Sequence, residues 1–333
     1  MHKTELKLVA VVDMGTTNTR LSLLDESGAT RSMAKGAFGV KDRAAGGGRA
    51  VLIKGLHGLV RQALDQCGLS RDAIATMLCS GMITSEVGLK EIPHRVAPAS
   101  IRDLAANAVE IKMSDIGPMP IIFIPGIKNR IASGDPQALY QMDFMRGEET
   151  QVFGAMDLFD IKLPATFMFL SSHTKLVDVD GNGSICESFT TLSGQIFNSL
   201  RYQSLLASSL PDEEPPHLHL DLLKQGVQAG LDYGLQRSAL LVRFMDTLQD
   251  TRPEERFAFL EGIVLASDLR AIRKGYPRLR QRVYMLGNRL RAEAYQAALL
   301  GYINPDVRCD YLGEDSMDEA AKRGAWRIAN LRT

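Results

Sequence analysis

One arrangement of strands and turns occurs twice along the chain, and this repetition is the strongest constraint on its fold. Residues 6–12 form a short run rich in β-branched side chains, which ends in a small polar turn at residues 13–18. A second strand at 19–25 and a turn at 26–28 then predict a hairpin that leads to a third strand. The first half therefore opens with three consecutive antiparallel strands.

The second half of the chain repeats this order. Residues 165–170 form an apolar strand, residues 171–173 a small polar turn, and residues 175–179 a second strand that a glycine-rich turn joins to a third. Helices and strands alternate after the opening strands in both halves, which is typical of α/β layering. We therefore predict a duplicated α/β fold with two domains, residues 1–160 and 161–333.

Periodicity predicts the remaining elements. Apolar residues at helical spacing indicate helices, and short apolar runs that end at turn residues indicate strands. The helices predicted in this way are 51–64, 148–158, 289–300 and 317–331, and the strands are 73–79, 119–124, 184–190 and 283–286. We expect the last helix to pack back on the first domain. This plan resembles the duplicated ribonuclease H-like fold of actin, hexokinase and Hsp70, in which two domains flank a central cleft.

Charge and cysteine content limit the classes of partner. The 39 basic and 39 acidic residues cancel, and no long block of one sign occurs, so the electrostatic footprint that nucleic acid or an anionic membrane requires is missing. The four cysteines form no CxxC pair, which indicates reduced thiols in the cytoplasm. No apolar run approaches the length of a membrane helix, and we identify no export signal. A small-molecule partner is therefore expected, and a homodimer is left open.

The first polar turn has the composition of a phosphate-binding loop. Gly15 allows the backbone to approach a phosphate closely, and Thr16 and Thr17 supply donors. Asp13 is placed to hold Mg²⁺ directly or through water, and Arg20 would add a guanidinium to the phosphate cluster. The alternative is an ordinary β-turn, because Asp, Gly and Thr are common in turns for local reasons.

The second polar turn is rich in donors that would suit the far side of a nucleoside triphosphate. Its candidates are Ser172, His173, Thr174 and Lys175. Gly287 follows a predicted strand and precedes a helix, at the position where the backbone passes close to the adenosine of ATP in actin-like folds. Both features have simpler explanations, namely a solvated hairpin end and an ordinary strand-to-helix turn.

Several separated motifs resemble those of one family of sugar-acid kinases. Residues 13–20 (DMGTTNTR), 80–88 (SGMITSEVG) and 145–151 (MRGEETQ) match its segments, and 173–175 and 192–194 are similar to two more. The chain thus resembles the 2-keto-3-deoxygalactonate kinases (2-dehydro-3-deoxygalactonokinases) of bacterial galactonate catabolism. The resemblance implies a phosphotransferase with an alcohol acceptor, which uses ATP and Mg²⁺ to phosphorylate the terminal hydroxyl of 2-dehydro-3-deoxy-D-galactonate to the 6-phosphate.

The chain also departs from the family pattern. The family usually has Pro-Gly-Thr before the histidine, where this chain has Leu170, Ser171 and Ser172. Loss of that glycine puts the second phosphate contact in question, so a nucleotide- or sugar-binding regulator of the same fold without catalysis is an alternative. Another keto-deoxy sugar acid such as 2-keto-3-deoxygluconate is an alternative substrate, because pocket geometry sets which hydroxyl orientation is accepted.

Phosphoryl transfer requires a carboxylate that orients the attacking hydroxyl and accepts its proton. By the resemblance, Glu148 takes the place of the catalytic aspartate of related sugar kinases, and Glu149 is the alternative. Adjacent carboxylates are also common in the first turn of a helix, because the helix dipole favours them there. A sugar acid requires a cation and hydrogen-bonding groups in its pocket, for which the matched segments offer Arg146, Ser85 and Asn18.

Overall fold

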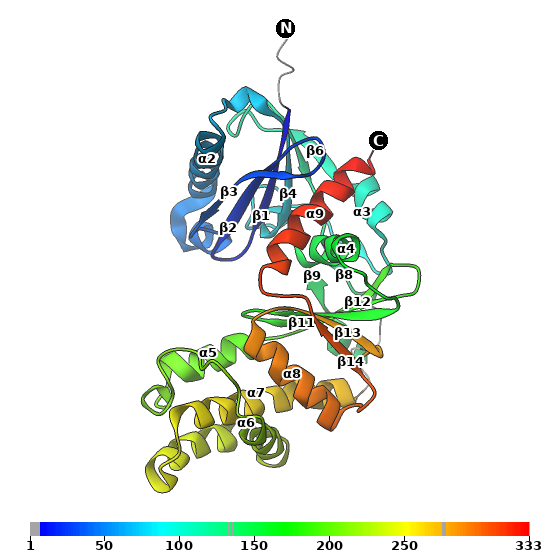
Figure 1. Ribbon diagram of the computed structural model, residues 1–333. Coiled ribbons are helices and arrows are strands. Elements are labelled where there is room, and N and C mark those ends of the chain that lie inside the picture. Colours follow the sequence, from blue (N-terminus) through cyan, green and yellow to red (C-terminus); the bar gives the residue numbers. More distant parts are fainter. Residues whose placement is uncertain (1–6, 132–133, 135, 275–277, 333) are drawn as a thin grey trace. The chain divides into compact units, whose positions relative to one another are not determined.

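The computed structural model describes residues 7–131, 134, 136–274 and 278–332 (Figure 1). Contacts divide the chain into two units. The second unit is Lys162–Ser316, and the first combines the described residues up to Ile161 with those from Met317 onward. The expected division at residue 160 placed this last segment in the second domain, whereas its contacts assign it to the first unit.

The first unit contains a six-stranded sheet in the order β3-β2-β1-β4-β7-β6. The strands are β1 (Leu8–Met14), β2 (Thr19–Leu24), β3 (Thr30–Gly36), β4 (Ile74–Gly81), β6 (Val109–Lys112) and β7 (Pro120–Phe123). The first three strands are antiparallel neighbours, whereas β4 runs parallel to β1 and β7 runs parallel to β4. The carboxyl ends of β1 and β4 therefore share one edge of the sheet, where open α/β sheets bind their ligands.

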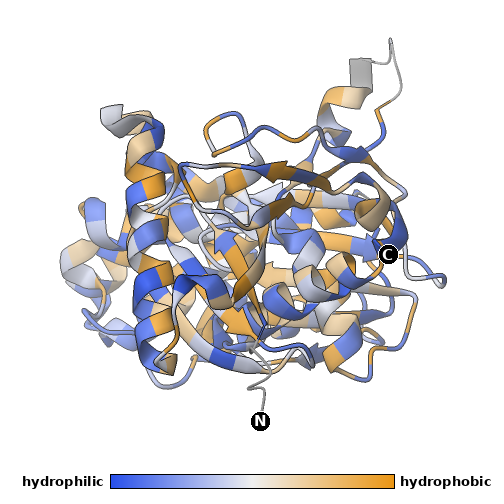
Figure 2. Ribbon diagram, turned by 90° about the horizontal axis from the view of Figure 1, so that it is seen from above, coloured by the Kyte–Doolittle hydropathy of each residue, from blue (hydrophilic) through white to orange (hydrophobic). Residues whose placement is uncertain are grey.

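Alternation of side chains separates the two faces of β1. The even-numbered residues 8 to 14 are fully buried in the core that α2 (Gly48–Cys67) covers. Val11 and Asp13 point to the opposite face, where α9 (Ser316–Asn330) packs. Figure 2 shows that hydrophobic residues are frequent on the central strands, as a sheet covered on both faces requires. Because side chains alternate along β1, Asp13 lies on the face that α9 covers.

A second, three-stranded sheet leads the chain into α4 (Glu148–Leu158). It pairs β5 (Arg95–Val96), β8 (Ile127–Lys128) and β9 (Phe144–Met145). Each strand has two residues, too few for alternation to reveal it, and sequence analysis did not predict this sheet. The shorter helical segments of this unit are α1 (Val40–Asp42), α3 (Ile101–Asn107), the π-helix Arg43–Gly47, and the 3₁₀ turns Arg71–Ala73, Met82–Thr84 and Pro136–Gln141.

Two glycines allow α9 to pack closely against α4. A Cβ atom on Gly154 or on Gly324 would overlap a carbonyl oxygen of the other helix, so the two backbones are in direct contact. Asp157 of α4 forms ion pairs with two arginines of α9, Arg323 and Arg327. The last helix is therefore fixed to the first unit both by backbone contact and by charge.

The second unit repeats the strand order of the first. Its sheet has the order β12-β11-β10-β13-β14, with β10 to β12 antiparallel and β13 and β14 parallel to β10. The strands are β10 (Ala165–Leu170), β11 (Thr174–Val179), β12 (Ile185–Thr191), β13 (Arg282–Gly287) and β14 (Arg308–Tyr311). This order corresponds to β3-β2-β1-β4-β7, which confirms the predicted duplication.

Helices of the second unit bury the faces of this sheet and one another. They are α5 (Ser193–Gln203), α6 (Leu220–Gln249), α7 (Pro253–Arg273), α8 (Arg289–Tyr302) and the 3₁₀ turn Ala207–Ser209. Gly226 of α6 and Gly262 of α7 each face the backbone of the other helix, which permits close packing. Met168 of the sheet, Leu265 of α7 and Tyr295 of α8 belong to one buried cluster.

The predicted elements differ from the observed ones mainly at their ends. The strand 165–170 and the helix 148–158 have the predicted bounds. The first strand continues through Asp13 and Met14, which pair with Arg20 and Thr19 across the ladder. Pairing with a neighbour extends a strand beyond its apolar run, so the first polar turn is confined to residues 15–18.

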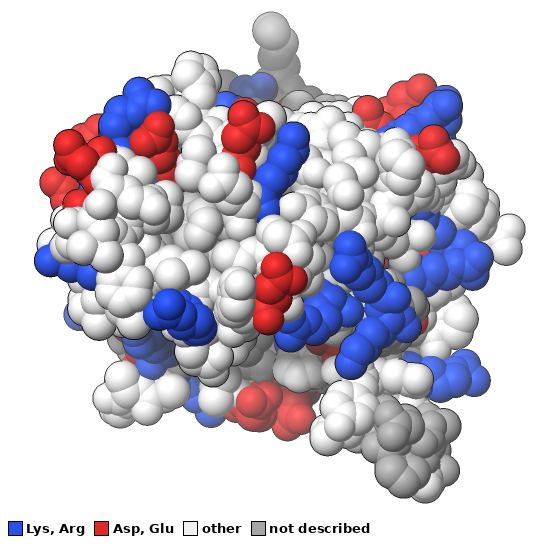
Figure 3. Space-filling model, turned by 90° about the horizontal axis from the view of Figure 1, so that it is seen from below, with Lys and Arg blue, Asp and Glu red and all other residues white. Residues whose placement is uncertain are grey.

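Two further observations concern the apolar content of the helices and the charge of one face. Among the described residues, no helix combines the length and apolar content that crossing a bilayer demands. Figure 3 shows one face of the molecule, on which acidic and basic side chains form separate small groups among uncharged residues. This face therefore presents no continuous surface of one charge.

Candidate active site

Asp13 lies at the carboxyl end of β1, beside two glycines from distant segments. Gly81 ends β4 with a φ of 81°, and a Cβ atom on it would lie 2.9 Å from Asp13 Oδ1. Gly147 precedes α4 with a φ of 108°, and its Cβ position lies 3.6 Å from the same oxygen. Glycine adopts these backbone conformations without strain and leaves room beside the carboxylate. Two segments that are far from Asp13 in the sequence thus converge on it.

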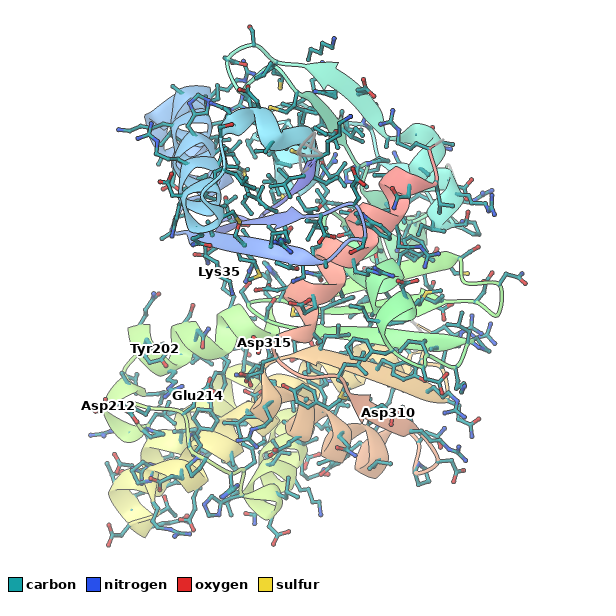
Figure 4. All side chains as sticks on the ribbon, turned by 45° about the horizontal axis from the view of Figure 1, so that its top comes forward. Lys35, Tyr202, Asp212, Glu214, Asp310 and Asp315 are labelled. Carbon is teal, nitrogen blue, oxygen red and sulfur yellow. The ribbon has the colours of Figure 1, made fainter. Side chains whose placement is uncertain are left out.

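A row of charged side chains crosses the sheet from Asp13. In the strand ladder Asp13 is opposite Arg20, and Arg20 is opposite Lys35, which lies at the surface of this unit (Figure 4). Asp318 of α9 lies over the row, with Oδ1 2.7 Å from Arg20 Nε and Oδ2 2.8 Å from Lys35 Nζ. Arg20 Nη1 is 3.9 Å from Asp13 Oδ2. Arg20 therefore lies between two carboxylates.

The acidity of Asp13 reflects this environment. Its pKa is raised to about 6, mainly because burial disfavours the charged form. Arg20 opposes the shift, whereas the negative charges of Asp318 and Glu148 add to it. A carboxyl whose pKa is raised by burial and by neighbouring charges is typical of a functional site.

Glu149 fixes the entrance to α4 from the interior. Its side chain is fully buried, and both carboxylate oxygens accept the backbone N–H of Gly147, at 2.9 and 2.8 Å. Burial raises the pKa of Glu149 to about 8, and the neighbouring charge of Glu148 adds to the shift. A buried carboxyl bonded to its own turn holds that turn in place and is poorly placed to meet a substrate.

Glu148 occupies the first turn of α4 and is half-buried. The residue before it, Gly147, has its Cβ position 3.6 Å from Asp13 Oδ1, so the start of α4 lies beside Asp13, and the negative charge of Glu148 adds to the raised pKa of Asp13. Of the two predicted catalytic carboxylates, the structure therefore brings Glu148 toward Asp13 and turns Glu149 into the interior.

Arg146 and Ser85 belong to a cluster of hydrogen bonds next to this edge. Arg146 donates from Nη1 to the hydroxyl of Thr84 at 2.8 Å and from Nη2 to the carbonyl of Ile92 at 2.9 Å. Partial burial lowers the pKa of Arg146. Ser85 is 2% exposed, and its hydroxyl donates to the carbonyl of Met82 at 2.7 Å. Arg146 thus brings a cation to the cluster, whereas the Ser85 hydroxyl is engaged in its own turn.

The first polar turn presents its side chains to solvent. The Gly15 N–H donates to the carbonyl of Asn18 at 2.8 Å, which closes the turn. Gly39 packs against the turn, and a Cβ on it would come within 2.5 Å of the carbonyl oxygens of Gly15 and Thr16. The side chains of Thr16, Thr17 and Asn18 are exposed. Their hydroxyl and amide groups are therefore accessible to a ligand.

Asp13 fits the kind of magnesium ligand that kinases use. Mg²⁺ usually keeps several waters and binds one or two carboxylates together with the phosphate oxygens of the substrate. Asp13 supplies such an oxygen at the carboxyl end of β1, beside the space that Gly81 and Gly147 leave. In the part of the chain that the structure describes, no three His, Cys, Asp or Glu side chains form a group able to hold a metal.

The second unit contains a cavity of about 190 Å³ beside the polar turn that follows β10. The N-termini of α5 and α8 both border it, and helix N-termini favour anionic groups. Glu214, on the segment before α6, contributes an acidic group (Figure 4). The lining residues are Ser171, Gly194, Phe197, Asn198, Glu214, Phe257, Glu261, Asn288, Leu290 and Arg291.

Arg291 fixes the second polar turn against this cavity. Its Nη1 donates to the carbonyl of Ser171 at 2.8 Å and its Nη2 to the hydroxyl of Thr174 at 3.0 Å, so the guanidinium spans the turn. Its Nε lies 3.2 Å from Glu261 Oε1, and this carboxylate balances a cation that is only 8% exposed. Gly194 packs on both partners, because a Cβ on it would overlap the Ser171 carbonyl and the guanidinium.

A buried carboxylate supports the same turn from behind. Asp268 Oδ2 accepts the hydroxyls of Ser193 at 2.6 Å, of Thr191 at 3.1 Å and of Tyr295. Burial raises the pKa of Asp268, and the bonds from Ser193 and Tyr295 oppose that shift. Tyr295 also contacts the hydroxyl of Thr174 at 2.8 Å. This network joins the turn to α5, α7 and α8.

The predicted residues of the second turn lie close to this cavity. Ser172 is exposed, with its hydroxyl 3.2 Å from His173 Nδ1, whereas Thr174 and Lys175 are buried at the start of β11. Gly287 ends β13 with a φ of 108°, and the residue that follows it lines the cavity. The cavity is thus lined by Ser171 and Asn288, which are direct sequence neighbours of the predicted residues Ser172 and Gly287, and not by the predicted residues themselves.

Sequence analysis missed several members of both sites. Asp318 and Lys35 of the first unit carry no local motif. Glu261 and Arg291 of the second unit were likewise not singled out, although one signal was present. Arg291 occupies the first turn of its helix, where the dipole disfavours a cation, and such a residue needs a reason to be there.

One family model matches nearly the whole chain. The model of the family described as 2-keto-3-deoxy-galactonokinase matches residues 13–328, from the Asp13 carboxylate into the last helix. The chain belongs to this family. Membership in the 2-keto-3-deoxy-galactonokinase family confirms the resemblance noted in the motifs.

Individual relatives agree with this assignment. "Probable 2-dehydro-3-deoxygalactonokinase DgoK1" of Rhizobium meliloti (strain 1021) is 26% identical over 211 residues, which are 62% of this chain and 60% of that protein. The aligned part of the chain thus spans about three fifths of that relative.

Solved structures show the fold. A crystal structure of a protein assigned as a 2-dehydro-3-deoxygalactonokinase from Sinorhizobium meliloti has a TM-score of 0.72 at 21% identity, covering 97% of this chain and 98% of its own. Component A of the (R)-2-hydroxyglutaryl-CoA dehydratase of Acidaminococcus fermentans has a TM-score of 0.54 at 11% identity, with 98% and 100% coverage. These similarities confirm the predicted ribonuclease H-like, actin-type fold class.

Proposed function

We propose that this chain transfers the terminal phosphate of ATP to the terminal hydroxyl of 2-dehydro-3-deoxy-D-galactonate and so forms the 6-phosphate. The observation that carries the proposal is that the start of α4, which carries Glu148, lies beside Asp13 at one sheet edge, where Gly81 and Gly147 leave space next to the Asp13 carboxylate. The family match and the DgoK1 relative supply the substrate class. We further propose that the reaction takes place in the cytoplasm, where ATP is available.

Glu148 is the proposed general base. The acceptor hydroxyl becomes a better nucleophile when a carboxylate within hydrogen-bond reach takes its proton during transfer. Glu148 is half-buried at the start of α4, whereas Glu149 is fully buried and bonded to the backbone of Gly147. We therefore assign proton acceptance to Glu148, and to Glu149 the task of fixing the backbone turn that presents it.

The phosphates are the proposed ligands of the first polar turn. Gly15, Thr16 and Thr17 offer backbone and hydroxyl donors at the carboxyl edge of the sheet, and Arg20 lies next to Asp13 on the same edge. Asp13 is the proposed ligand of Mg²⁺, which when bound neutralises negative charge on the phosphate oxygens. The protein contributes position and charge, which are the main requirements of phosphoryl transfer.

The second unit supplies the proposed nucleotide site. Its cavity is bordered by two helix N-termini and by the turn that carries Ser172 to Lys175. Gly287 lies directly before Asn288, the N-cap residue of α8. Mixed polar and apolar walls of this kind suit a nucleoside. Phe197, Phe257 and Leu290 supply apolar surface, and Asn288 and Glu214 supply polar groups.

The carboxylate of the sugar acid requires a cation. Arg146 is the proposed partner, because its guanidinium is held half-buried beside the catalytic edge by Thr84 and Ile92. Asn18, exposed at the end of the first turn, is proposed to hydrogen-bond a substrate hydroxyl. Ser85 is proposed to shape this pocket, because its hydroxyl is bonded to Met82.

Turnover assays test the proposal directly. We expect purified protein with Mg²⁺ and ATP to release ADP when 2-dehydro-3-deoxy-D-galactonate is added, and to release less with the gluconate-derived epimer; phosphorus NMR should place the new phosphate on the terminal carbon. A Glu148→Gln variant should lose about 10²- to 10⁴-fold in kcat. Glu149→Gln is the matched control and should lose far less, because a buried amide can still accept the Gly147 N–H.

Two outcomes would reject parts of this assignment. Wild-type turnover by Glu148→Gln would eliminate Glu148 as the base. Tight ATP binding without release of ADP, for any keto-deoxy acid tested, would favour a regulator of the same fold, which the Ser171 and Ser172 departure from the family pattern also suggests.

A further inference from the structure

Asp318 contacts the active-site edge although it belongs to the last helix. Its two carboxylate oxygens are divided between two cations, 2.7 Å from Arg20 Nε and 2.8 Å from Lys35 Nζ. The Asp318 side chain is 20% exposed and that of Arg20 is 40% exposed. Arg20 therefore keeps donor groups accessible at the surface while its Nε side is held by α9.

Two carboxylates compete for Arg20. Asp13 Oδ2 is 3.9 Å from Nη1, which is beyond a direct hydrogen bond, whereas Asp318 makes the close contact. If Asp318 released the guanidinium, Asp13 would be the adjacent carboxylate able to bind it. Closure of Arg20 on Asp13 would occupy the oxygen that the proposed function reserves for Mg²⁺ and would withdraw the guanidinium from the phosphate.

We propose that Asp318 is a positioning residue that holds Arg20 away from Asp13 and directs it toward the terminal phosphate of the bound nucleotide. The inference rests on the proposed function, because it assumes that the Asp13 edge receives the phosphate. It gives the last helix a role in ligand binding in addition to its packing role. Lys35 shares the second oxygen of Asp318 and so fixes the direction of the carboxylate.

The contacts that dock α9 are separate from this ion pair. Gly154 and Gly324 bring the α4 and α9 backbones together, and Asp157 binds Arg323 and Arg327, about one and a half and two and a half turns beyond Asp318. A change at Asp157 therefore weakens the docking of α9 without removing the partner of Arg20. This separation supplies a matched control for the proposal.

The test compares Asp318→Asn with Asp157→Asn in the full chain. Unfolding in urea, followed by the fluorescence of Trp326 on α9, measures how much each variant loosens the helix; Trp326 is the single tryptophan of the chain. Binding of ATP and of ADP, each with Mg²⁺, is measured by titration calorimetry, and kcat and KM for ATP are measured where turnover occurs. Asp318→Glu serves as the conservative variant.

We expect Asp318→Asn to weaken ATP binding at least tenfold while ADP binding changes less than threefold, because Arg20 is directed at the terminal phosphate. Asp157→Asn should leave the ratio of ATP to ADP affinity unchanged at a similar loss of stability, and Asp318→Glu should recover part of the ratio. Equal ATP-to-ADP ratios in wild type and Asp318→Asn would overturn the proposal.

The binding ratio keeps this inference distinct from the proposed function. A wild-type protein that binds ATP more tightly than ADP but transfers no phosphate would reject the kinase proposal, and the Asp318→Asn ratio would still decide the role of Asp318. A wild-type protein that binds ATP and ADP equally would overturn the positioning role, because no interaction with the terminal phosphate would exist for Arg20 to make.

Discussion

Replacement of Glu149 by glutamine should change how the stability of the first unit depends on pH. Glu149 is fully buried, and burial raises its pKa from 4.5 to about 8. The folded protein therefore binds this proton more tightly than the unfolded chain does. The resulting stabilisation is complete below pH 4.5 and is lost as the pH rises toward 8, because ionisation inside the protein is unfavourable.

The size of the effect follows from the two pKa values. One unit of difference in pKa corresponds to about 1.4 kcal/mol. Between pH 5 and pH 7 the unfolded chain loses the proton while the folded protein largely retains it, so the free energy of unfolding should fall by about 2.5 kcal/mol from this group alone. Glutamine does not titrate, so Glu149→Gln should lack this component while it keeps an oxygen that can accept the Gly147 N–H.

Urea unfolding at pH 5, 6, 7 and 8, followed by the fluorescence of Trp326, measures the difference between the two proteins. Trp326 lies on α9 in the same unit as Glu149, so its signal reports the relevant part of the chain. Other titrating groups contribute to both proteins and largely cancel in the difference. Parallel stability curves for wild type and Glu149→Gln from pH 5 to 8 would refute the reasoning, because the Glu149 carboxyl would then have the same acidity folded and unfolded.

Two glycine substitutions test the close contacts in each unit. Gly324→Ala should destabilise the first unit by about 1–3 kcal/mol, because its Cβ would overlap a carbonyl oxygen of α4. The control is Gly58→Ala on α2, where nothing lies within 4 Å of the added Cβ and the change should be neutral or stabilising. Equal changes in the free energy of unfolding in urea would contradict the direct backbone contact. Gly194→Ala should weaken ATP binding about tenfold in calorimetry, because the added methyl displaces the Arg291 guanidinium from the second turn. Unchanged ATP affinity in this variant would contradict the assignment of the cavity to nucleotide binding.

The architecture could be predicted because residues close together in the sequence specify the strands and turns of each half. A β-branched run, a small polar turn and a second run specify a hairpin, and the repetition of this order specifies a duplicated sheet. The carboxyl edge of β1 was found for the same reason, since residues 13–18 combine an acidic side chain with glycine and threonines. Sequence patterns of this kind are reliable when the interactions that they describe lie within a few residues.

The site itself could be predicted only in part, because its remaining members meet through tertiary packing. Asp318 reaches Arg20 because Gly154 and Gly324 allow two helices to touch, and neither glycine differs locally from any other helical glycine. The two predicted carboxylates were adjacent in the sequence and equal in chemistry. Only the burial of Glu149 against the Gly147 N–H separates their roles.

The first unit is discontinuous, since its last helix follows the whole of the second unit in the chain. During translation, Lys162–Ser316 is synthesised before the rest of α9, so the sequence of the second unit is complete while the first unit still lacks its last helix. A premature stop after residue 316 would therefore leave the sequence of the second unit complete and deprive Arg20 of its partner Asp318. Such a product would contain the complete sequence of the second unit and a first unit that lacks its last helix.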